Sequence, residues 1–272
     1  METGWERNRR THFDEIVLNY DRVRPEYPRA LFEDITAYSG PGRGKKALEI
    51  GAGTGKATAP ILAAVYDVTA VEIGANMAEF LRDKFRAHEG FRVIVSAFED
   101  AILEEGGYDL VYAASAFHWV DAEIGCPKAF RLLKNGGTFA LMRYNTFRFV
   151  DEALNEEIQA VYDKYYLGYY KQKKRLPDRS REDFRKPSEI LGGYGFEDMG
   201  RYGFRDVALN LYDVTRTFGA DEYILFLDTL ADHRNLPEGD RAALYAGVRE
   251  AILRHGGQYG MDDVFQLYMG RK

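Results

Sequence analysis

Short apolar runs alternate with helix-like stretches between residues 46 and 143. Helix-like stretches such as NMAEFLRDKFRAH (76–88) separate these runs. Near-continuous apolar strands that alternate with helices indicate a parallel sheet buried on both faces. The pattern therefore predicts a doubly wound α/β sheet. Its first five strands are expected at KALEI (46–50), VTAVEI (68–73), FRVIVSAF (91–98), YDLVYAAS (108–115) and GTFALMRY (137–144).

The pattern changes after residue 150. Residues 151–192 are helix-like and rich in tyrosine, and we expect no strand there. Further strands are expected at 196–209 and in the C-terminal stretch MDDVFQLYMGRK, with mostly helix over 212–255. The helix before the fifth strand should end at Asn135-Gly136-Gly137, a glycine-type stop. The prediction is a mostly parallel seven-stranded sheet with a helical insertion or lid.

We expect a single domain built from four consecutive parts. The insertion is expected to cover the edge of the sheet. The four parts are a helical N-terminal cap (1–45), a ligand-binding core (46–150), the insertion (151–192) and a C-terminal part that completes the sheet (193–272).

A glycine-rich stretch, EIGAGTGKAT (49–58), joins the first strand to the first helix. A phosphate-binding loop needs a glycine five positions before Gly55 and a Ser or Thr after Lys56, but Ile50 and Ala57 stand there. The dinucleotide fingerprint is also not matched, because the spacing is G-x-G-x-G and not G-x-G-x-x-G. The acidic Glu49 beside the loop would repel a pyrophosphate, so these residues favour a ligand with a positive centre.

LEIGAGTG, with the segments that follow it, resembles the class I S-adenosylmethionine-dependent methyltransferases. Glu72 ends the second strand 21 residues after Gly51, where a carboxylate can accept hydrogen bonds from both ribose hydroxyls. SAFED (96–100), YDLVYAASAFHWV (108–120) and LLKNGGTFAL (132–141) resemble the family's later motifs, in the family's order. NYDRVRPEYP (19–28) and FHWVD (117–121) are similar to a small-molecule group that includes the trans-aconitate methyltransferases.

This resemblance implies S-adenosyl-L-methionine as the cofactor and a set of site residues. Tyr27, His118 and Trp119 are expected to bind the methyl acceptor. His118 is also the candidate general base if the acceptor is a neutral hydroxyl or amine, whereas a carboxylate needs no base. The cofactor contacts are expected from Tyr20, Arg24, Glu49, Gly51, Ala52, Gly53, Thr54, Gly55, Glu72, Ile73, Met77, Ala97, Phe98, Glu99, Ala114 and Phe117.

Several of these positions have a purely structural alternative. Phe98 can be a core residue, and the His118–Trp119 pair can serve as a structural hydrogen-bonding turn. Between residues 171 and 186 there are eight basic residues and three acidic ones. Such a run is either a solvated face or, if it overhangs the site, an attraction for an anionic acceptor.

Composition narrows the class of protein. Lys and Arg number 37 against 43 Asp and Glu, and the net charge of −6 argues against general nucleic-acid binding. No apolar run approaches the roughly 20 residues of a membrane span, so we expect a soluble, cytoplasmic protein. The single cysteine allows no intrachain disulfide, and the five histidines lack metal-ligand spacing, so no metal is expected.

The sequence thus predicts a methyltransferase that acts on a small molecule, with a carboxylate or other anion as a candidate acceptor. Two alternatives stay open. One is a cofactor-binding regulatory or interaction protein that has lost turnover, and the other is an NAD-dependent oxidoreductase. The oligomeric state is not predicted.

Overall fold

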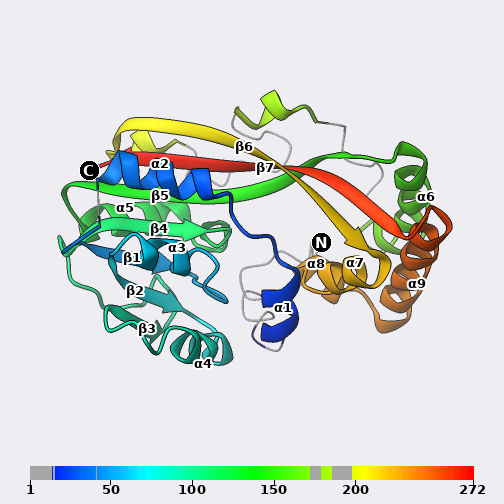
Figure 1. Cartoon of the computed structure of the whole chain (residues 1–272), viewed down its shortest axis with the longest axis horizontal. Helices are drawn as coiled ribbons and strands as arrows, with labels where there is room; N and C mark the ends of the chain where they lie inside the picture. Colours follow the sequence, from blue (N-terminus) through cyan, green and yellow to red (C-terminus); the bar gives the residue numbers. More distant parts are fainter. Residues whose placement is uncertain (1–13, 15, 41, 172–178, 186–197) are drawn as a thin grey trace. The chain divides into compact units, whose positions relative to one another are not determined.

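The computed structural model describes residues 14, 16–40, 42–171, 179–185 and 198–272. Its centre is a seven-stranded sheet with the strand order β3-β2-β1-β4-β5-β7-β6 (Figure 1). This confirms the predicted fold class. The strands are β1 (Lys46–Ile50), β2 (Asp67–Glu72), β3 (Phe91–Val95), β4 (Tyr108–Ala114), β5 (Leu133–Phe149), β6 (Arg205–Gly219) and β7 (Gln258–Arg271).

Most of the sheet is parallel. Strand β1 pairs in parallel with β2 and β4, β2 pairs with β3, and β4 pairs with β5. Strand β7 runs antiparallel to β5, because the Val150 N–H donates to the Gly260 carbonyl and the Lys272 N–H donates to the Gly137 carbonyl. The carboxyl ends of β1, β2, β3 and β4 therefore lie at one edge, where ligands bind in sheets of this type.

Along the described chain, α1 and α2 precede β1, and the other helices lie between successive strands (Figure 1). Asp121 caps α5 by accepting from the Glu123 N–H at 3.1 Å, and Asp151 caps α6 by accepting from the Leu154 N–H at 2.9 Å. The α-helices are α1 (Val17–Val23), α2 (Arg29–Ser39), α3 (Thr58–Ala63), α4 (Ala75–Lys84), α5 (Ala122–Leu132), α6 (Glu152–Tyr162), α7 (Ala220–Leu227), α8 (Ala231–Arg234) and α9 (Glu238–Arg254). Shorter turns are η3 (Phe117–Trp119), the π-helix η4 (Asp163–Leu167), η5 (Arg181–Arg185) and η6 (Met199–Tyr202).

The chain divides into two compact units, and each is described by itself. The core unit comprises Glu26–Tyr144, Glu182–Tyr212 and Val264–Lys272. The helical unit comprises Met1–Pro25, Asn145–Arg181 and Asp213–Asp263. Strands β5, β6 and β7 contribute residues to both.

Each unit has a hydrophobic core of its own. In the core unit, α3 and α4 pack on β2 and β3, α5 packs on β4, and side chains such as Leu48, Val111 and Phe139 are buried. In the helical unit, α9 packs against α6 and α7 around residues such as Leu154 and Leu244.

Three predicted boundaries were wrong. Strand β6 begins at Arg205 and extends to Gly219, so 198–204 is a turn and 212–219 is strand where helix was expected. The strand signature was hidden because Arg216 stands at a nearly buried position and is neutralised by an ion pair with Asp263. Strand β5 begins at Leu133, so the glycine-type stop lies inside a strand, where Gly136 has φ +75°.

The four-part organisation and the lid stay predictions. Residues 172–178 and 186–192 of the expected insertion lie outside the described residues. Among the helices that the structure describes, none combines the length and the apolar character that a membrane span requires.

Candidate functional site

The loop after β1 has a backbone that only glycine adopts readily. Gly51, Gly53 and Gly55 have φ values of +66°, +55° and +81°. A Cβ on Gly51 would lie 2.6 Å from the Cβ of Ala116, and a Cβ on Gly55 would lie 2.4 Å from the ring of Phe85. The loop therefore fits closely between the loop after β4 and the end of helix α4, and side chains at Gly51 and Gly55 would clash with these neighbours.

Glu72, at the end of β2, ties two loops of this edge together. Its Oε2 accepts a hydrogen bond from the Gly53 N–H at 2.8 Å, and its Oε1 accepts one from the Gly74 N–H at 2.9 Å. The backbone carbonyl of Glu72 accepts from the Ser96 N–H in the loop after β3. Because the carboxylate has further lone pairs, it can still accept hydrogen bonds from ligand hydroxyls. Ile73 and Met77 follow it, the first partly exposed and the second buried.

Glu49 lies on β1, beneath the glycine loop, and is buried. Its Oε2 accepts hydrogen bonds from Thr58 Oγ1 at 2.5 Å and from Tyr112 Oη at 2.9 Å. Burial raises the pKa of Glu49 to about 7, and the Glu72 charge adds to the increase, while the two hydroxyl donors oppose it. This carboxyl therefore joins β1 to α3 and β4. Its expected contact with a cationic ligand stays a prediction.

Thr54 carries a buried polar atom that no described residue satisfies. The side chain is 2% exposed, and its Oγ1 has no hydrogen-bond partner among the residues that the structure describes. The Thr54 carbonyl, in contrast, accepts from Lys84 Nζ at 2.9 Å. Buried hydroxyls are rarely left without a hydrogen-bond partner. A polar ligand bound beside the loop could supply that partner to Thr54 Oγ1.

The loop after β3 brings its aromatic ring into the core. Phe98 is 3% exposed and packs against Phe117, with ring centroids 6.5 Å apart. Phe117 in turn packs against Phe139 at 5.4 Å. Lys128 Nζ donates to the carbonyl of Glu99 at 3.0 Å and fixes the loop that also holds Ala97. The adenine contact expected of Ala97, Phe98 and Glu99 stays a prediction.

The loop after β4 carries the predicted acceptor residues. Ala114 is the last residue of β4, and His118 and Trp119 lie in η3 with their rings 5.2 Å apart. Tyr27 Oη donates to Ser115 Oγ at 2.8 Å. Ser115 has a φ of +50° and was not singled out from the sequence. The neighbouring residues do not predict a left-handed conformation at the end of a strand.

Tyr20 and Arg24 belong to the helical unit. The Arg24 guanidinium donates to the carbonyl of Thr229 and lies over the rings of Tyr20 and Phe226, at 4.8 and 5.7 Å. The structure therefore gives both residues partners within this unit. Their predicted cofactor contact stays a prediction.

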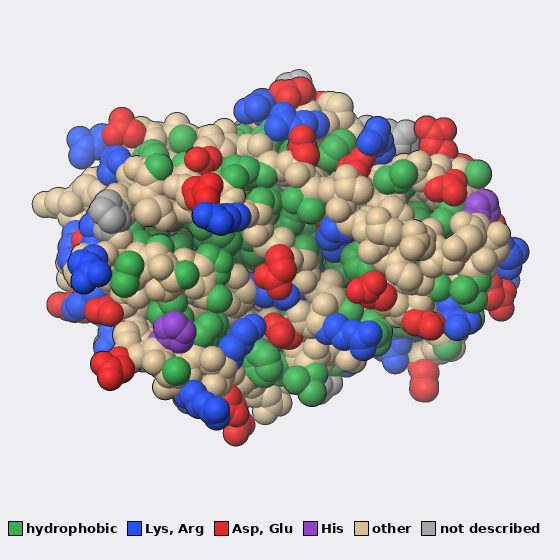
Figure 2. Space-filling model, viewed as in Figure 1, with side chains coloured by type: hydrophobic (Ala, Val, Ile, Leu, Met, Phe, Trp, Pro, Cys, Tyr) green, Lys and Arg blue, Asp and Glu red, His purple; other side chains and the backbone are tan. Residues whose placement is uncertain are grey.

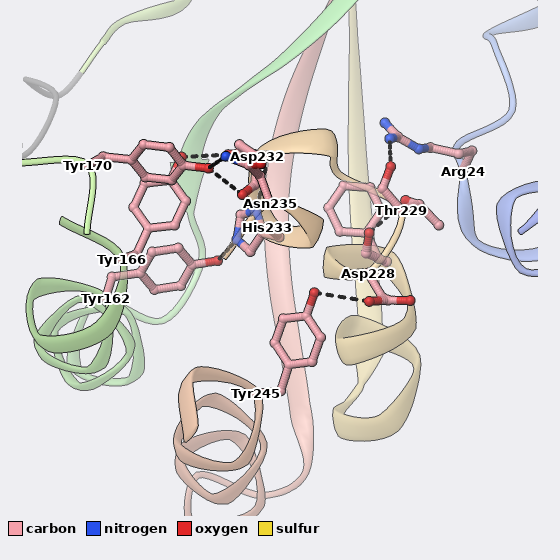
Figure 3. Close-up of polar contacts among 11 residues, drawn as sticks. Arg24, Tyr162, Tyr166, Tyr170, Asp228, Thr229, Asp232, His233, Asn235 and Tyr245 are labelled. Atoms are coloured by element: carbon pink, nitrogen blue, oxygen red, sulfur yellow. Dashed lines mark hydrogen bonds and ion pairs between the residues drawn. The ribbon is translucent and has the colours of Figure 1, made fainter. Parts of the chain in front are cut away.

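A second polar cluster in the helical unit was missed from the sequence (Figure 3). His233 Nδ1 lies 3.1 Å from Asp232 Oδ1, and its Nε2 shares a hydrogen bond of 2.7 Å with Tyr162 Oη. Tyr166 Oη donates to Asp232 Oδ2 at 2.5 Å, and Tyr170 Oη donates to the Asp232 carbonyl at 2.6 Å. The spacing of these tyrosines, four residues apart, was the available signal for a shared face.

This cluster is suited to structure and not to proton transfer. Burial raises the pKa of Tyr162, and the nearby Tyr223 and Asp232 add to the increase. Burial also raises the pKa of Tyr166, again with Asp232 contributing. Both hydroxyls therefore remain protonated at neutral pH. Among the described residues, no group of three His, Cys, Asp or Glu side chains is arranged to hold a metal ion.

The basic run is only partly described. Arg181 is paired with Asp213 at 2.7 Å, and Arg185 with Glu182 at 2.8 Å. The face shown in Figure 2 has Lys and Arg side chains interspersed with Asp and Glu. Lys171 and Arg179 are also described, whereas Lys173, Lys174, Arg175 and Lys186 lie outside the described residues.

Comparisons with known proteins identify the family. A family model described as "Methyltransferase domain" matches residues 48–141. An uncharacterised methyltransferase-like protein of Schizosaccharomyces pombe is 34% identical over 242 residues, which cover 88% of this chain and 84% of that protein. An uncharacterised methyltransferase of Mycobacterium tuberculosis is 32% identical over 134 residues, 49% of this chain. The match spans only about half, 52%, of that mycobacterial relative.

Solved structures share the fold. A protein of Anaeromyxobacter dehalogenans assigned to the type II methyltransferases has a TM-score of 0.59 at 23% identity, over 91% of this chain and 97% of that one. A phosphoethanolamine N-methyltransferase of Haemonchus contortus, solved with S-adenosylhomocysteine, has a TM-score of 0.52 at 13% identity. That alignment covers 95% of this chain and 57% of the other.

Proposed function

Because this chain belongs to the class I S-adenosylmethionine-dependent methyltransferases, we propose that it transfers a methyl group to a small-molecule acceptor. The cofactor is S-adenosylmethionine. The proposal goes beyond the family in naming the class of acceptor. The narrower likeness to the trans-aconitate methyltransferases stays a prediction.

The residues at the carboxyl edge fit this cofactor. The observation that carries the assignment is Glu72, whose carboxylate closes the glycine loop at Gly53 and keeps lone pairs for ribose hydroxyls. Thr54 Oγ1, buried and without a partner among the described residues, adds a polar contact. Gly51 and Gly55 keep side chains out of the loop.

When bound, the cofactor supplies an electrophilic methyl group on a sulfonium centre. The residues of the chain have two tasks, to hold the acceptor in line with this methyl group and to exclude water. His118 and Trp119 are the candidates for positioning the acceptor. His118 would accept the proton of a neutral hydroxyl or amine acceptor, while a carboxylate acceptor would need no base.

A small anionic acceptor is the finer part of the proposal. The net charge of −6 and the mixed charges in Figure 2 speak against nucleic acid as the acceptor. The cation excess between 171 and 186 supports an anion, although Arg181 and Arg185 are already paired with carboxylates.

The test has two arms. Calorimetry should show binding of S-adenosylhomocysteine and no binding of NAD. A panel of small carboxylates, phenols and amines is then incubated with cofactor labelled at the methyl group, and the proposal expects transfer to a carboxylate. Cofactor binding without transfer to any member, together with a stable protein partner in pull-down experiments, would instead indicate a regulatory protein.

A further inference from the structure

Two neighbouring residues of the core unit form hydrogen bonds to two different loops at the cofactor edge, which is the edge formed by the carboxyl ends of β1, β2, β3 and β4. Lys56, at the end of the glycine loop, donates from Nζ to Glu26 Oε1. Tyr27 Oη donates to Ser115 Oγ in the loop after β4. Residues 25–28 have no helix or strand structure. These adjacent residues therefore contact two separate loops.

Ser115 is held in a conformation that serine rarely adopts. Its φ of +50° lies in the left-handed region, which is sparsely populated by residues other than glycine, asparagine and aspartate. Two hydrogen bonds hold it there, one from its own N–H to the Met142 carbonyl at 2.8 Å and one from Tyr27 to its Oγ. The surrounding structure therefore has to stabilise this turn.

The conformation of Ser115 sets the position of the residues that follow. Ala116 lies against Gly51 so closely that a Cβ on Gly51 would be 2.6 Å away. The carbonyl of Ala116 accepts from the Trp119 N–H at 3.0 Å and begins the turn with His118. A change of φ at Ser115 would thus move both the wall of the glycine loop and the candidate acceptor residues.

We propose that Tyr27 and Ser115 are positioning residues, in which the Tyr27 hydroxyl holds Ser115 in its left-handed conformation and so keeps the loop after β4 ready to bind the cofactor. This inference rests on the proposed function and names the two residues that order its cofactor site before the cofactor binds. Preorganised loops bind more tightly because less ordering is required at binding.

The ring of Tyr27 is anchored independently of its hydroxyl. It makes edge contacts with Phe32 of α2 and Phe265 of β7, with centroids 6.2 and 5.5 Å apart. Phe265 is itself stacked on Tyr144. Tyr27→Phe therefore removes the hydrogen bond to Ser115 and leaves the aromatic packing in place.

The test compares the affinity for S-adenosylhomocysteine, by calorimetry, with the thermal midpoint. Tyr27→Phe and Ser115→Ala should each weaken binding about fivefold, the effect of one lost hydrogen bond. Ser115→Gly relieves the strained φ, so its Tm should exceed that of Ser115→Ala by about 2–4 °C. We expect it nevertheless to bind the weakest of the three, because the freed loop must be ordered by the ligand.

Two matched variants serve as controls. Val65 also has a positive φ, +65°, but precedes β2 at the opposite end of the strand, so Val65→Gly should raise the Tm without changing affinity. Tyr38 Oη donates to the Asp206 carbonyl at 2.7 Å, so Tyr38→Phe removes a comparable hydrogen bond away from the site.

The outcomes are separable. Equal affinity of Ser115→Gly and wild type, with a raised Tm, would show that the turn is only structural and would overturn the inference. If Tyr27→Phe binds S-adenosylhomocysteine as tightly as the wild type does, Tyr27 has no positioning role. If the wild-type protein itself fails to bind S-adenosylhomocysteine, the proposed function fails first, whatever the variants do.

Discussion

Glu49 in the core unit and Asp232 in the helical unit are both buried carboxyl groups, yet their surroundings have opposite effects. Glu49 faces two neutral hydroxyls and lies near the charge of Glu72, and burial raises its pKa to about 7. Burial also raises the pKa of Asp232, but the hydrogen bonds and charge of His233, with Tyr166, outweigh this and hold it below the ordinary value.

The contrast extends to the hydrogen bonds around each group. In the helical unit, the carboxylate, the imidazole and the tyrosine hydroxyls satisfy one another (Figure 3). At the cofactor edge of the core unit, Thr54 Oγ1 has no partner among the described residues. A dense polar network therefore does not by itself mark a binding site. Polar groups that the protein leaves unsatisfied are the better guide.

Asp232→Ala should have the largest effect, and it should fall on stability alone. Removing one partner of a buried charged network typically costs about 3–5 kcal/mol. Urea denaturation should show this loss, while the folded variant should bind S-adenosylhomocysteine as the wild type does. If the affinity for S-adenosylhomocysteine falls together with stability, the polar cluster of the helical unit is not purely structural.

Glu49→Gln should change the dependence of stability on pH. The pKa of Glu49 is higher in the folded protein than its ordinary value of 4.5, so its contribution to stability is full below pH 4.5 and is lost as pH rises through about 7. The glutamine variant does not ionise, so relative to wild type it should gain up to about 3 kcal/mol between pH 4.5 and 8. Denaturant titrations across this range provide the measurement.

Asp232 should respond to pH in the opposite direction. Its pKa is lowered in the folded protein, so its stabilisation is present above the ordinary value of 3.8 and is lost as pH falls through the lowered one. If Glu49→Gln and wild type instead changed in parallel from pH 4.5 to 8, the assigned environment of Glu49 would be wrong.

Glu72→Gln should act on cofactor binding. The amide NH₂ would face a backbone N–H of Gly53 or Gly74, so one charge-assisted hydrogen bond is replaced by two opposed donors. We expect binding of S-adenosylhomocysteine to weaken by about 2–3 kcal/mol, the range for hydrogen bonds to charged groups. Glu79→Gln, on the exposed side of α4, is the control. Unchanged affinity would remove Glu72 from the site.

Thr54→Val should have the smallest effect on binding, and it allows a direct comparison with a threonine of the helical unit. Its hydroxyl has no protein partner to lose among the described residues, so stability should hold or rise, while binding of S-adenosylhomocysteine should weaken by about 1 kcal/mol. Thr229→Val is the counterpart, because Thr229 Oγ1 donates to the Phe226 carbonyl at 2.6 Å in the helical unit. That variant should lose stability and keep its affinity. The reverse pattern would contradict the comparison.

The parts of the fold that could be predicted share one physical property. Strands β1, β2 and β4 are mostly apolar because nearly all of their residues are buried, and their sequences show it. The glycine loop could also be predicted, because its positive φ values require glycine. These features depend on residues close together in the chain.

The features that were missed depend on contacts distant in sequence. Strand β6 contains Arg216, whose charge is balanced by Asp263 on another strand. Tyr27 and Ser115 are 88 positions apart, and neither residue type alone predicts their hydrogen bond. The pair of Asp232 and His233 becomes a network only when tyrosines some 60 to 70 residues earlier reach it. A single sequence gives no signal for such pairings.

The strand order has a consequence for how the chain is made. Strand β7 lies between β5 and β6, although it is the last of the seven strands to leave the ribosome. Until it emerges, β6 has no neighbour in the sheet, and β5 keeps one edge unpaired. Unpaired strand edges are sites of aggregation during synthesis. A nascent or prematurely terminated chain lacking β7 should therefore depend on chaperones, even with its entire cofactor loop already translated.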